Sequence, residues 1–310
     1  MNGRLSKGRE NSACTLKMKS KVSYPVAVID IGSNSVRLMT DSGDKKQKRI
    51  ITTRLAEGKV ENRLANASIL RTVNAVSLLF EKAVKEGCNS VFIFATAAVR
   101  NSINGSDVAL LIKQKTGVTV DVVSGETEAN LAVLGALNGS FGGVIDIGGA
   151  STEVAYRENE TEYAVSYDVG AVTLHDKCGR DETLIESCLQ AIIKGVRRRF
   201  IGDFYAIGGT CTALASIDLN LLEYDRDKVH GHYLSLKAVK DLSNKLSALS
   251  PQEIKERYPT AKSRADVIFG GSKILLSVME GYGLQGVIVS ESDNLEGYLE
   301  YLLKNEEKND

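Results

Sequence analysis

Two stretches of the 310-residue chain carry almost the same residues: VIDIGSNSVRL at 28–38 and VIDIGGASTEV at 144–154. Each is an apolar, β-rich run that ends in Asp, with a Gly two residues later, a small hydroxyl-bearing turn and a return strand. A repeat this specific predicts two similarly built halves that arose by duplication. Strand and helix patterns alternate through both halves, which indicates an α/β architecture with mixed sheets covered by helices.

The domain organisation follows from this repeat. We expect a disordered basic tail at 1–21, a first lobe at 22–140 and a second lobe at 141–310, whose last helix packs back on the first lobe. Periodicity and turn residues predict strands at 24–31, 35–41, 48–54, 90–95, 118–123, 143–149, 162–168, 203–208 and 286–290, and helices at 62–86, 105–115, 126–138, 181–200, 210–216, 235–248, 263–281 and 294–304.

Composition excludes several classes of protein. Lys plus Arg and Asp plus Glu each number 39, so the overall charge offers no grip on nucleic acid or on an anionic membrane. Five cysteines with no CxxC spacing argue against a disulfide framework or a Cys-based zinc site and favour a reducing cytosol. No run of about 18 apolar residues is present, so no membrane-spanning helix is expected. We therefore predict a cytoplasmic protein.

Both Asp-Ile-Gly turns have the composition of a phosphate cradle. Glycines let backbone N–H groups approach an anion closely, and hydroxyl and amide side chains add donors. An Asp at the base of such a loop is typical of a group that holds Mg²⁺ or positions water, because a bare carboxylate would repel phosphate. A third glycine turn, GGT at 208–210, follows a strand and opens a helix whose N-terminus favours an anion. None of these turns matches the P-loop or the dinucleotide-binding pattern.

Two phosphate loops in duplicated lobes imply the two-lobed actin-like (ribonuclease H-like) fold, with the loops facing each other across a central cleft. Over about residues 24–300 the chain resembles the exopolyphosphatase / guanosine pentaphosphate phosphohydrolase (Ppx/GppA) family in its short two-lobed form. The resemblance rests on DIGSNSVRL at 30–38, ATAAVRNSIN at 95–104, SGETEANLAVLG at 124–135, DIGGASTEV at 146–154, GGTCTALA at 208–215, VHGHYLS at 229–235 and SRADVIFGGSKIL at 263–275.

This resemblance implies an activity and roles for individual residues. The activity is a Mg²⁺-dependent phosphohydrolase that releases terminal phosphate from inorganic polyphosphate, or the 5′-phosphate of guanosine pentaphosphate, and the resemblance suggests a homodimer. Glu128 matches the carboxylate that activates the attacking water, and Arg100 matches an Arg that contacts the terminal phosphate. The expected phosphate-binding residues are Gly32, Ser33, Asn34, Ser35, Arg100, Gly148, Gly149, Ser151, Thr152, Gly208, Gly209 and Thr210, and the expected metal ligands are Asp146, Glu153 and Asp30.

Two departures from the family pattern leave other functions open. Ala150 stands where the second loop usually has a third glycine, and its Cβ would crowd a phosphate or require a different φ. The Gly-Leu-Arg-Glu-Gly turn usual near the C-terminus reads SDNLEG at 292–297, in which Asp293 adds negative charge. One alternative is therefore a catalytically weak sensor that binds (p)ppGpp or polyphosphate. Another is an ATP-using kinase of actin-like fold, although the SGETEA context of Glu128 argues against it.

Four smaller features have two interpretations each. The basic residues at 45–49 either steer a polyphosphate chain or form a solvated hairpin tip, and the Arg triplet at 197–199 either lines a polyanion channel or complements a helix dipole. His230 and His232 form an HxH pair without a carboxylate or Cys cluster nearby in sequence, so a structural role is favoured over metal binding. Cys211 is expected to be a small buried residue and not a nucleophile, because no His lies near it in sequence.

Overall fold

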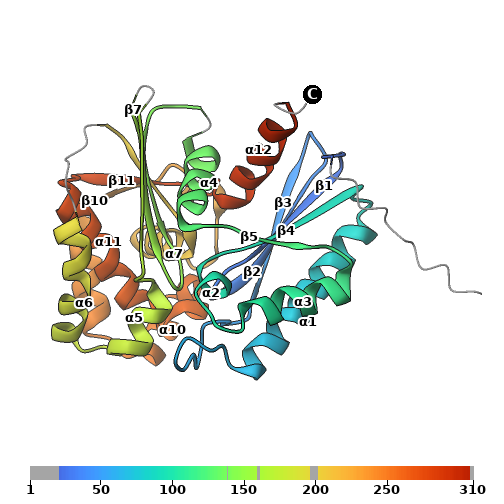
Figure 1. Cartoon of the computed structure of the whole chain (residues 1–310). Helices are drawn as coiled ribbons and strands as arrows, with labels where there is room; N and C mark the ends of the chain where they lie inside the picture. Colours follow the sequence, from blue (N-terminus) through green and yellow to red (C-terminus); the bar gives the residue numbers. More distant parts are fainter. Residues whose placement is uncertain (1–20, 138, 159–160, 196–201, 308–310) are drawn as a thin grey trace, which may run out of the picture.

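The computed structural model describes residues 21–137, 139–158, 161–195 and 202–307. The described strands form two mixed sheets, one in each half of the molecule (Figure 1). The first sheet contains β1 (Val26–Ile31), β2 (Ser35–Asp41), β3 (Lys46–Thr52), β4 (Ser90–Ala95) and β5 (Val120–Val122). The second contains β6 (Gly142–Ile147), β7 (Thr152–Glu158), β8 (Thr161–Tyr167), β9 (Phe204–Ile207), β10 (Tyr233–Ser235) and β11 (Gly286–Val289).

Strand order in the two sheets confirms the duplication. The first sheet runs β3-β2-β1-β4-β5, and the second runs β8-β7-β6-β9-β11-β10. In both, an antiparallel three-strand meander is joined to parallel strands, since β1 is parallel to β4 and β6 is parallel to β9. Strand β11 takes the place of β5, and β10 adds an antiparallel edge strand. The predicted two-lobed actin-like (ribonuclease H-like) architecture is therefore correct.

Helices connect the strands and cover both sheets. The first half contains α1 (Asn66–Lys85), α2 (Ala97–Arg100), α3 (Gly105–Thr116) and α4 (Gly125–Leu137). The second half contains α5 (Ala171–Cys178), α6 (Glu182–Gly195), α7 (Gly208–Asp218), α8 (Arg226–Val229), α9 (Leu236–Ser247), α10 (Pro251–Arg257), the 3-10 helix η1 (Pro259–Arg264), α11 (Ile268–Tyr282) and α12 (Asn294–Glu307). No helix in these described ranges has both the length and the apolar character needed to cross a membrane.

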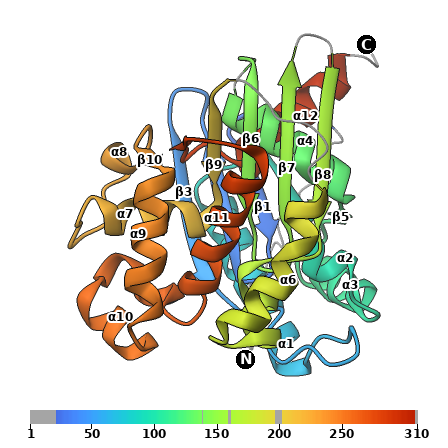
Figure 2. The same cartoon turned by 90° about the vertical axis from the view of Figure 1, so that its left-hand side faces the viewer.

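The apolar side chains divide into cores on the two faces of each sheet. Helices α1 and α3 bury their apolar faces against one side of the first sheet. Helix α12 covers the opposite side, where Leu295 and Leu299 pack with Val28. On the second sheet, α6, α9 and α11 lie on the outer face (Figure 2), and α4 packs Ala132 and Val133 on the inner face. Helices α4 and α12 thus lie between the two sheets.

Helices α4 and α12 cross at two glycines. A Cβ at Gly135 would lie 2.0 Å from the carbonyl oxygen of Asp293, and one at Gly297 would lie 1.9 Å from that of Leu131. Any larger residue would force the helices apart. The close crossing anchors α12 against α4 and the first sheet, and it places the segment that precedes α12 at the boundary between the halves.

Several predicted boundaries are wrong. The helix expected over 263–281 is divided, because η1 ends at Arg264 and α11 begins only at Ile268. Between them the chain turns so that Asp266 pairs with Arg54 of the first half at 2.9 Å, a long-range contact that local propensity cannot reveal. Helices α5 and α10 and strand β10 were not expected, since elements this short carry too little periodicity. The Arg triplet at 197–199 and residues 1–20 of the expected tail lie outside the described residues.

Candidate active site

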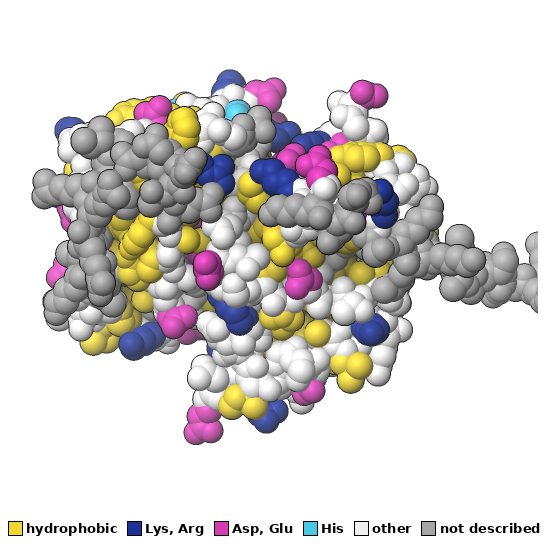
Figure 3. Space-filling model, turned by 45° about the horizontal axis from the view of Figure 1, so that its top comes forward, with side chains coloured by type: hydrophobic (Ala, Val, Ile, Leu, Met, Phe, Trp, Pro, Cys, Tyr) yellow, Lys and Arg dark blue, Asp and Glu magenta, His cyan; other side chains and the backbone are white. Residues whose placement is uncertain are grey.

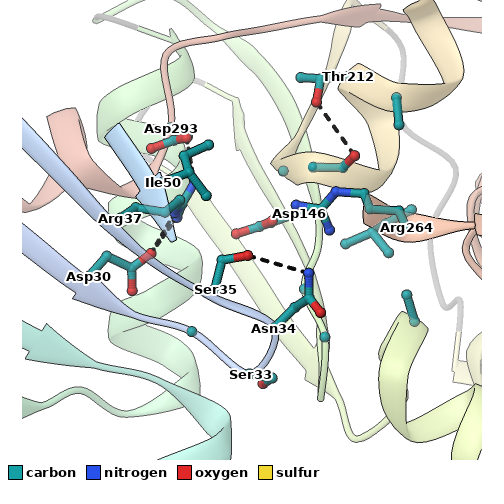
Figure 4. Close-up of a pocket in the computed structure, with 18 of the residues that line it drawn as sticks. Asp30, Ser33, Asn34, Ser35, Arg37, Ile50, Asp146, Thr212, Arg264 and Asp293 are labelled. Atoms are coloured by element: carbon teal, nitrogen blue, oxygen red, sulfur yellow. Dashed lines mark hydrogen bonds and ion pairs between the residues drawn. The ribbon is translucent and has the colours of Figure 1, made fainter. Parts of the chain in front are cut away.

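A cavity of about 630 Å³ lies between the two halves. On the face shown in Figure 3, basic and acidic side chains meet where the halves approach each other. The cavity walls come from the loops after β1 and β6, the N-terminus of α7 and the segment before α12 (Figure 4). The sequence-predicted residues that line it are Asp30, Gly32, Ser33, Asn34, Ser35, Glu128, Asp146, Gly148, Gly149, Ser151, Gly208 and Gly209. Asp30 and Asp146, which come from opposite halves, therefore share one cleft.

The two duplicated loops have the same hydrogen-bonded turn. The backbone N–H of Gly32 donates to the carbonyl of Ser35 at 3.0 Å, and that of Gly148 donates to the carbonyl of Ser151 at 3.0 Å. The loops also touch, since a Cβ at Gly149 would lie 2.6 Å from Cβ of Ser33. Only glycine allows this approach, which brings the backbone amides and hydroxyls of both loops to the floor of one cavity.

The third glycine turn supports an arginine. Gly208 has φ +85°, and a Cβ at Gly209 would lie 1.8 Å from Nη2 of Arg264, so the guanidinium lies directly on the backbone at the N-terminus of α7. In the described part of the chain, Arg264 has no ion-pair partner, and Figure 4 shows it pointing toward Asp146. Burial, followed by the charge of Arg37, lowers the pKa of Arg264 to about 10, so it stays charged at neutral pH. A helix N-terminus and a free guanidinium together form an anion site.

The repeated strands carry different cross-strand pairs at the same register. Asp30 on β1 faces Arg37 on β2, whose Nε donates to it at 2.9 Å. Asp146 on β6 faces Glu153 on β7, which is a second acid. Burial raises the pKa of Asp146 to about 6. Burial also raises the pKa of Glu153 well above its ordinary value, and the nearby charges of Glu128 and Asp146 add to this. The first half therefore holds an ion pair at this register, whereas the second holds two acids, neither of which has an ion-pair partner among the described residues.

Three buried side-chain oxygens that accept no hydrogen bond from the described residues have the chemistry of ligands for a divalent cation. Oδ1 of Asp30, Oε2 of Glu153 and Oδ1 of Asn294 are buried, and in the described ranges none accepts a hydrogen bond. Asn294 Nδ2 also donates to Oδ2 of Asp146 at 2.7 Å. Unsatisfied buried acceptors are costly, and oxygen ligands are those that Mg²⁺ prefers. No three His, Cys, Asp or Glu side chains in the described ranges already converge as a metal site. The bound ion would therefore complete its shell with water and phosphate oxygens, as is common for Mg²⁺.

Glu128 lies in the first turn of α4, buried on the wall of the cavity. Its Oε2 accepts a hydrogen bond from Nη1 of Arg100 at 2.8 Å, and the same Nη1 donates to the carbonyl of Val123 at 2.8 Å. Burial raises the pKa of Glu128 to about 7, although Arg100 opposes this shift. Arg100 itself lies outside the cavity lining, so the structure does not place it where the expected contact with a terminal phosphate would occur. Its contacts instead orient Glu128.

Two other predicted phosphate-binding residues turn their side chains into the protein. The hydroxyl of Thr152 donates to the carbonyl of Val169 at 2.5 Å. The side chain of Thr210 packs beside Gly271 of α11. Neither lines the cavity, and Ala150 does not line it either. Ala150 also has no positive φ, so its methyl group causes no backbone strain at this position.

Sequence reasoning did not assign four residues that line the cavity: Arg37, Lys48, Arg264 and Asn294. Three of them stand in stretches that were quoted above, namely SVRL, SRAD and SDNLEG, but nothing local indicated a role. Lys48 was considered part of a solvated hairpin tip. Instead it lies in β3, only 17% exposed, with Nζ 2.8 Å from Oε2 of Glu296. The interpretation as a hairpin tip is therefore wrong for Lys48.

The two histidines and Cys211 have structural surroundings. Nδ1 of His230 accepts from the backbone N–H of Glu291 at 3.2 Å, whereas Nε2 of His232 lies 2.9 Å from Oδ2 of Asp218. The HxH pair therefore serves two separate partners. Cys211 is fully buried, and burial strongly raises the pKa of its thiol, which suits a packing residue and not a nucleophile.

Comparison with known proteins identifies relatives that match most of this chain. The family model described as "Ppx/GppA phosphatase family" matches residues 26–306. Exopolyphosphatase 2 of Mycobacterium tuberculosis is 27% identical over 88% of this chain and 96% of its own length. The guanosine-5'-triphosphate,3'-diphosphate pyrophosphatase of Photobacterium profundum is 26% identical over 90% of this chain, which spans 59% of that relative. The chain spans about half, 49%, of another curated relative. The crystal structure of the Aquifex aeolicus Ppx/GppA family member superposes with a TM-score of 0.74 and 27% identity over 90% of this chain and 98% of that one.

Proposed function

We propose that this chain, which belongs to the Ppx/GppA phosphatase family, is a phosphoanhydride hydrolase. Its substrate ends in a phosphate chain, as inorganic polyphosphate and guanosine pentaphosphate do. The enzyme releases the terminal phosphate by attack of water. The observation that carries the proposal is the shared cavity, which is lined by the two duplicated phosphate loops, by the buried carboxylate of Glu128 and by the guanidinium of Arg264.

The residues of the cavity suit an attack by water on phosphorus. Phosphoryl transfer needs little covalent help from the protein and depends on positioning and on stabilising charge. Glu128 accepts the proton from the attacking water, and a pKa of about 7 makes it an effective base near neutral pH. Arg100 holds the carboxylate in place, as its bond to Oε2 indicates. Backbone amides of the two loops, together with Arg264, bind the phosphate oxygens.

We propose that Mg²⁺ is the metal cofactor. Asp146 and Glu153 would hold it, with the free Oδ1 of Asp30 as a further acceptor. When bound, the ion offsets negative charge on the phosphate oxygens. The support for this assignment is that, among the described residues, Asp146 and Glu153 have no ion-pair partner, and that buried oxygens of Asp30 and Glu153 accept no hydrogen bond. Chelation by EDTA is expected to abolish phosphate release, and added Mg²⁺ is expected to restore it.

The test of the function is a side-by-side measurement of phosphate release from tripolyphosphate, long-chain polyphosphate, guanosine pentaphosphate and ATP, with and without Mg²⁺. The wild type is compared with Glu128→Gln and with the matched control Glu126→Gln, because Glu126 lies exposed in the same turn of α4. Turnover by the wild type and the control but not by Glu128→Gln supports the proposal. Tight binding of these ligands without phosphate release would instead support the sensor, and phosphorylation of an acceptor by ATP would support the kinase.

We also propose a homodimer in the cytoplasm that binds neither nucleic acid nor membranes. A cytoplasmic location is supported by the free state of the four described cysteines, and the absence of binding to polyanionic surfaces by the balanced charge. The dimer is supported by the family resemblance alone. Light scattering after size-exclusion chromatography tests the oligomeric state, and cell fractionation tests the location.

A further inference from the structure

The positive charges that face the cavity are mostly neutralised by carboxylates of the chain. Four cationic residues line it: Arg37, Lys48, Arg226 and Arg264. Arg37 pairs with Asp30 and, through Nη1, with Oδ2 of Asp293 at 2.6 Å. Lys48 Nζ lies 2.8 Å from Oε2 of Glu296 and 3.5 Å from Oδ1 of Asp293. Arg226 Nε lies 3.7 Å from Glu291. Of these four lining cations, only Arg264 has no carboxylate partner in the described part of the chain.

The two ends of the cavity therefore differ in what they offer a phosphate chain. At the N-terminus of α7, the free guanidinium of Arg264 is available to an anion. Along β2 and β3, the charges of Arg37 and Lys48 already face Asp293, as Figure 4 shows for Arg37. A polyanion gains binding free energy when free Lys or Arg groups replace the cations condensed on it, so each protein cation that a carboxylate already neutralises lowers this gain. A chain that extended past Arg37 would have to displace Asp293.

Asp293 is held rigidly in this position. It is 8% exposed, its Oδ1 accepts from the backbone N–H of Leu295 at 3.0 Å, and its own N–H donates to Oε2 of Glu296 at 3.0 Å. The first is an N-cap bond to the second residue of α12, and the second is the return bond from the Glu three residues after the cap. Its carbonyl oxygen accepts from the N–H of Gly297 at 3.0 Å, at the close crossing of α12 with α4. The helix cap therefore fixes the carboxylate on Arg37, where a substrate oxygen would otherwise bind.

We infer that Asp293 is a specificity-determining residue, which occupies Arg37 and Lys48 and so limits the cleft to substrates that end in a short phosphate chain. Long inorganic polyphosphate is disfavoured because its successive charges meet an internal carboxylate where a free cation would be needed. This inference rests on the proposed function, because it names which phosphate chains the same cavity accepts. It also explains what the acidic turn before α12 does in this chain.

The test is Asp293→Asn, which removes the charge and keeps the cap, because Asn caps a helix as well as Asp does. Asp293→Ser, another good cap residue, serves as the second variant. The kcat and KM of each are measured on tripolyphosphate and on long-chain polyphosphate. We expect kcat/KM for the long chain to rise about tenfold relative to tripolyphosphate, mostly through KM, and the gain to shrink with added salt. A role limited to capping would change the two substrates equally.

The matched control is Glu86→Gln. Glu86 pairs with Arg49, which neighbours Lys48 on β3, but neither residue of this pair lines the cavity. The control should leave the ratio between the two substrates unchanged. If Asp293→Asn and Asp293→Ser are folded and active but keep the wild-type ratio, the inference is wrong while the hydrolase activity stands.

A binding measurement tests the role of Asp293 independently of phosphohydrolase activity. Calorimetry with tripolyphosphate and long-chain polyphosphate is carried out on Glu128→Gln with and without Asp293→Asn. A gain in affinity of about tenfold for the long chain only, in a protein that proves to have no phosphohydrolase activity, would uphold the role of Asp293 and refute the function. Equal gains for both chains, or none, would refute the role of Asp293 whether or not the wild type turns over.

Discussion

Replacing Glu128 by Gln is expected to raise stability at neutral and alkaline pH while removing activity. Burial is the largest cause of the shift that places the pKa of Glu128 at about 7 instead of 4.5. Because the folded-state pKa lies above the unfolded value, ionisation of Glu128 costs folding free energy. The wild type loses this free energy as the pH rises from about 4.5 to about 7, and the Gln variant does not.

The size of this effect follows from the pKa difference. A shift from 4.5 to about 7 corresponds to about 3 kcal/mol between the two protonation states. We therefore expect the unfolding free energies of wild type and Glu128→Gln to be nearly equal near pH 4.5, and the variant to be more stable by about 3 kcal/mol at pH 8. Urea unfolding at both pH values, followed by circular dichroism, measures the difference.

The same substitution tests the base in catalysis. Phosphate release by the variant should fall by about 10²- to 10⁴-fold, whereas the exposed control Glu126→Gln keeps the wild-type rate. In the wild type, kcat/KM should rise with pH up to about 7 and then level off, since the carboxylate must be ionised to accept a proton. A stability difference that does not change between pH 4.5 and 8, together with a flat rate profile over that range, would refute the assignment.

Three further substitutions probe the surroundings of Glu128 and the anion site. Arg100→Gln removes the group that lowers the pKa of Glu128, so the acidic limb of the pH–rate profile should move to higher pH, while a purely structural loss would lower the rate equally at all pH values. Arg264→Gln should raise KM for tripolyphosphate about 10- to 100-fold, because a free guanidinium that binds phosphate is lost, and an unchanged KM would show that Arg264 does not contact substrate. Gly209→Ala places a Cβ 1.8 Å from Nη2 of Arg264, so it should displace the guanidinium and also raise KM. The melting temperature should fall only slightly, because the end of a flexible side chain can move. Unchanged kinetics would contradict the predicted contact between Arg264 and substrate.

Much of the fold was predictable because the same sequence pattern occurs in both halves of the chain. An apolar run followed by an Asp and a Gly occurs at 28–38 and again at 144–154, which predicted two halves of similar construction. The two sheets have corresponding strand orders. Hydrophobic periodicity located the long helices, since α1 and α9 each bury one face. Short elements such as α5 and β10 were not predicted, because a few residues are too short a stretch to show hydrophobic periodicity. The division between η1 and α11 was not predicted; where the chain turns there, Asp266 pairs with Arg54 across the two halves, a contact that local pattern cannot reveal.

The same contrast holds for the site. Local pattern identified the glycine loops and the Asp residues at the strand ends, most of which line the cavity, whereas Glu128 was assigned through the family resemblance. It could not say that Arg100 bonds to Glu128 instead of lining the cavity, because 28 positions separate the two residues and only the folded chain brings them together.

The sequence alone therefore determined the duplicated architecture and the kind of chemistry, because strand periodicity and glycine turns are properties of neighbouring residues. Only the tertiary structure decided how charge is distributed across the cleft. The pairing of Arg37 with Asp293 spans 256 positions, and it exists because α12 returns to the first sheet through a crossing that two glycines permit. Coulomb attraction depends on distance in space and not along the chain, so the availability of a cation to substrate could be known only once the chain was folded.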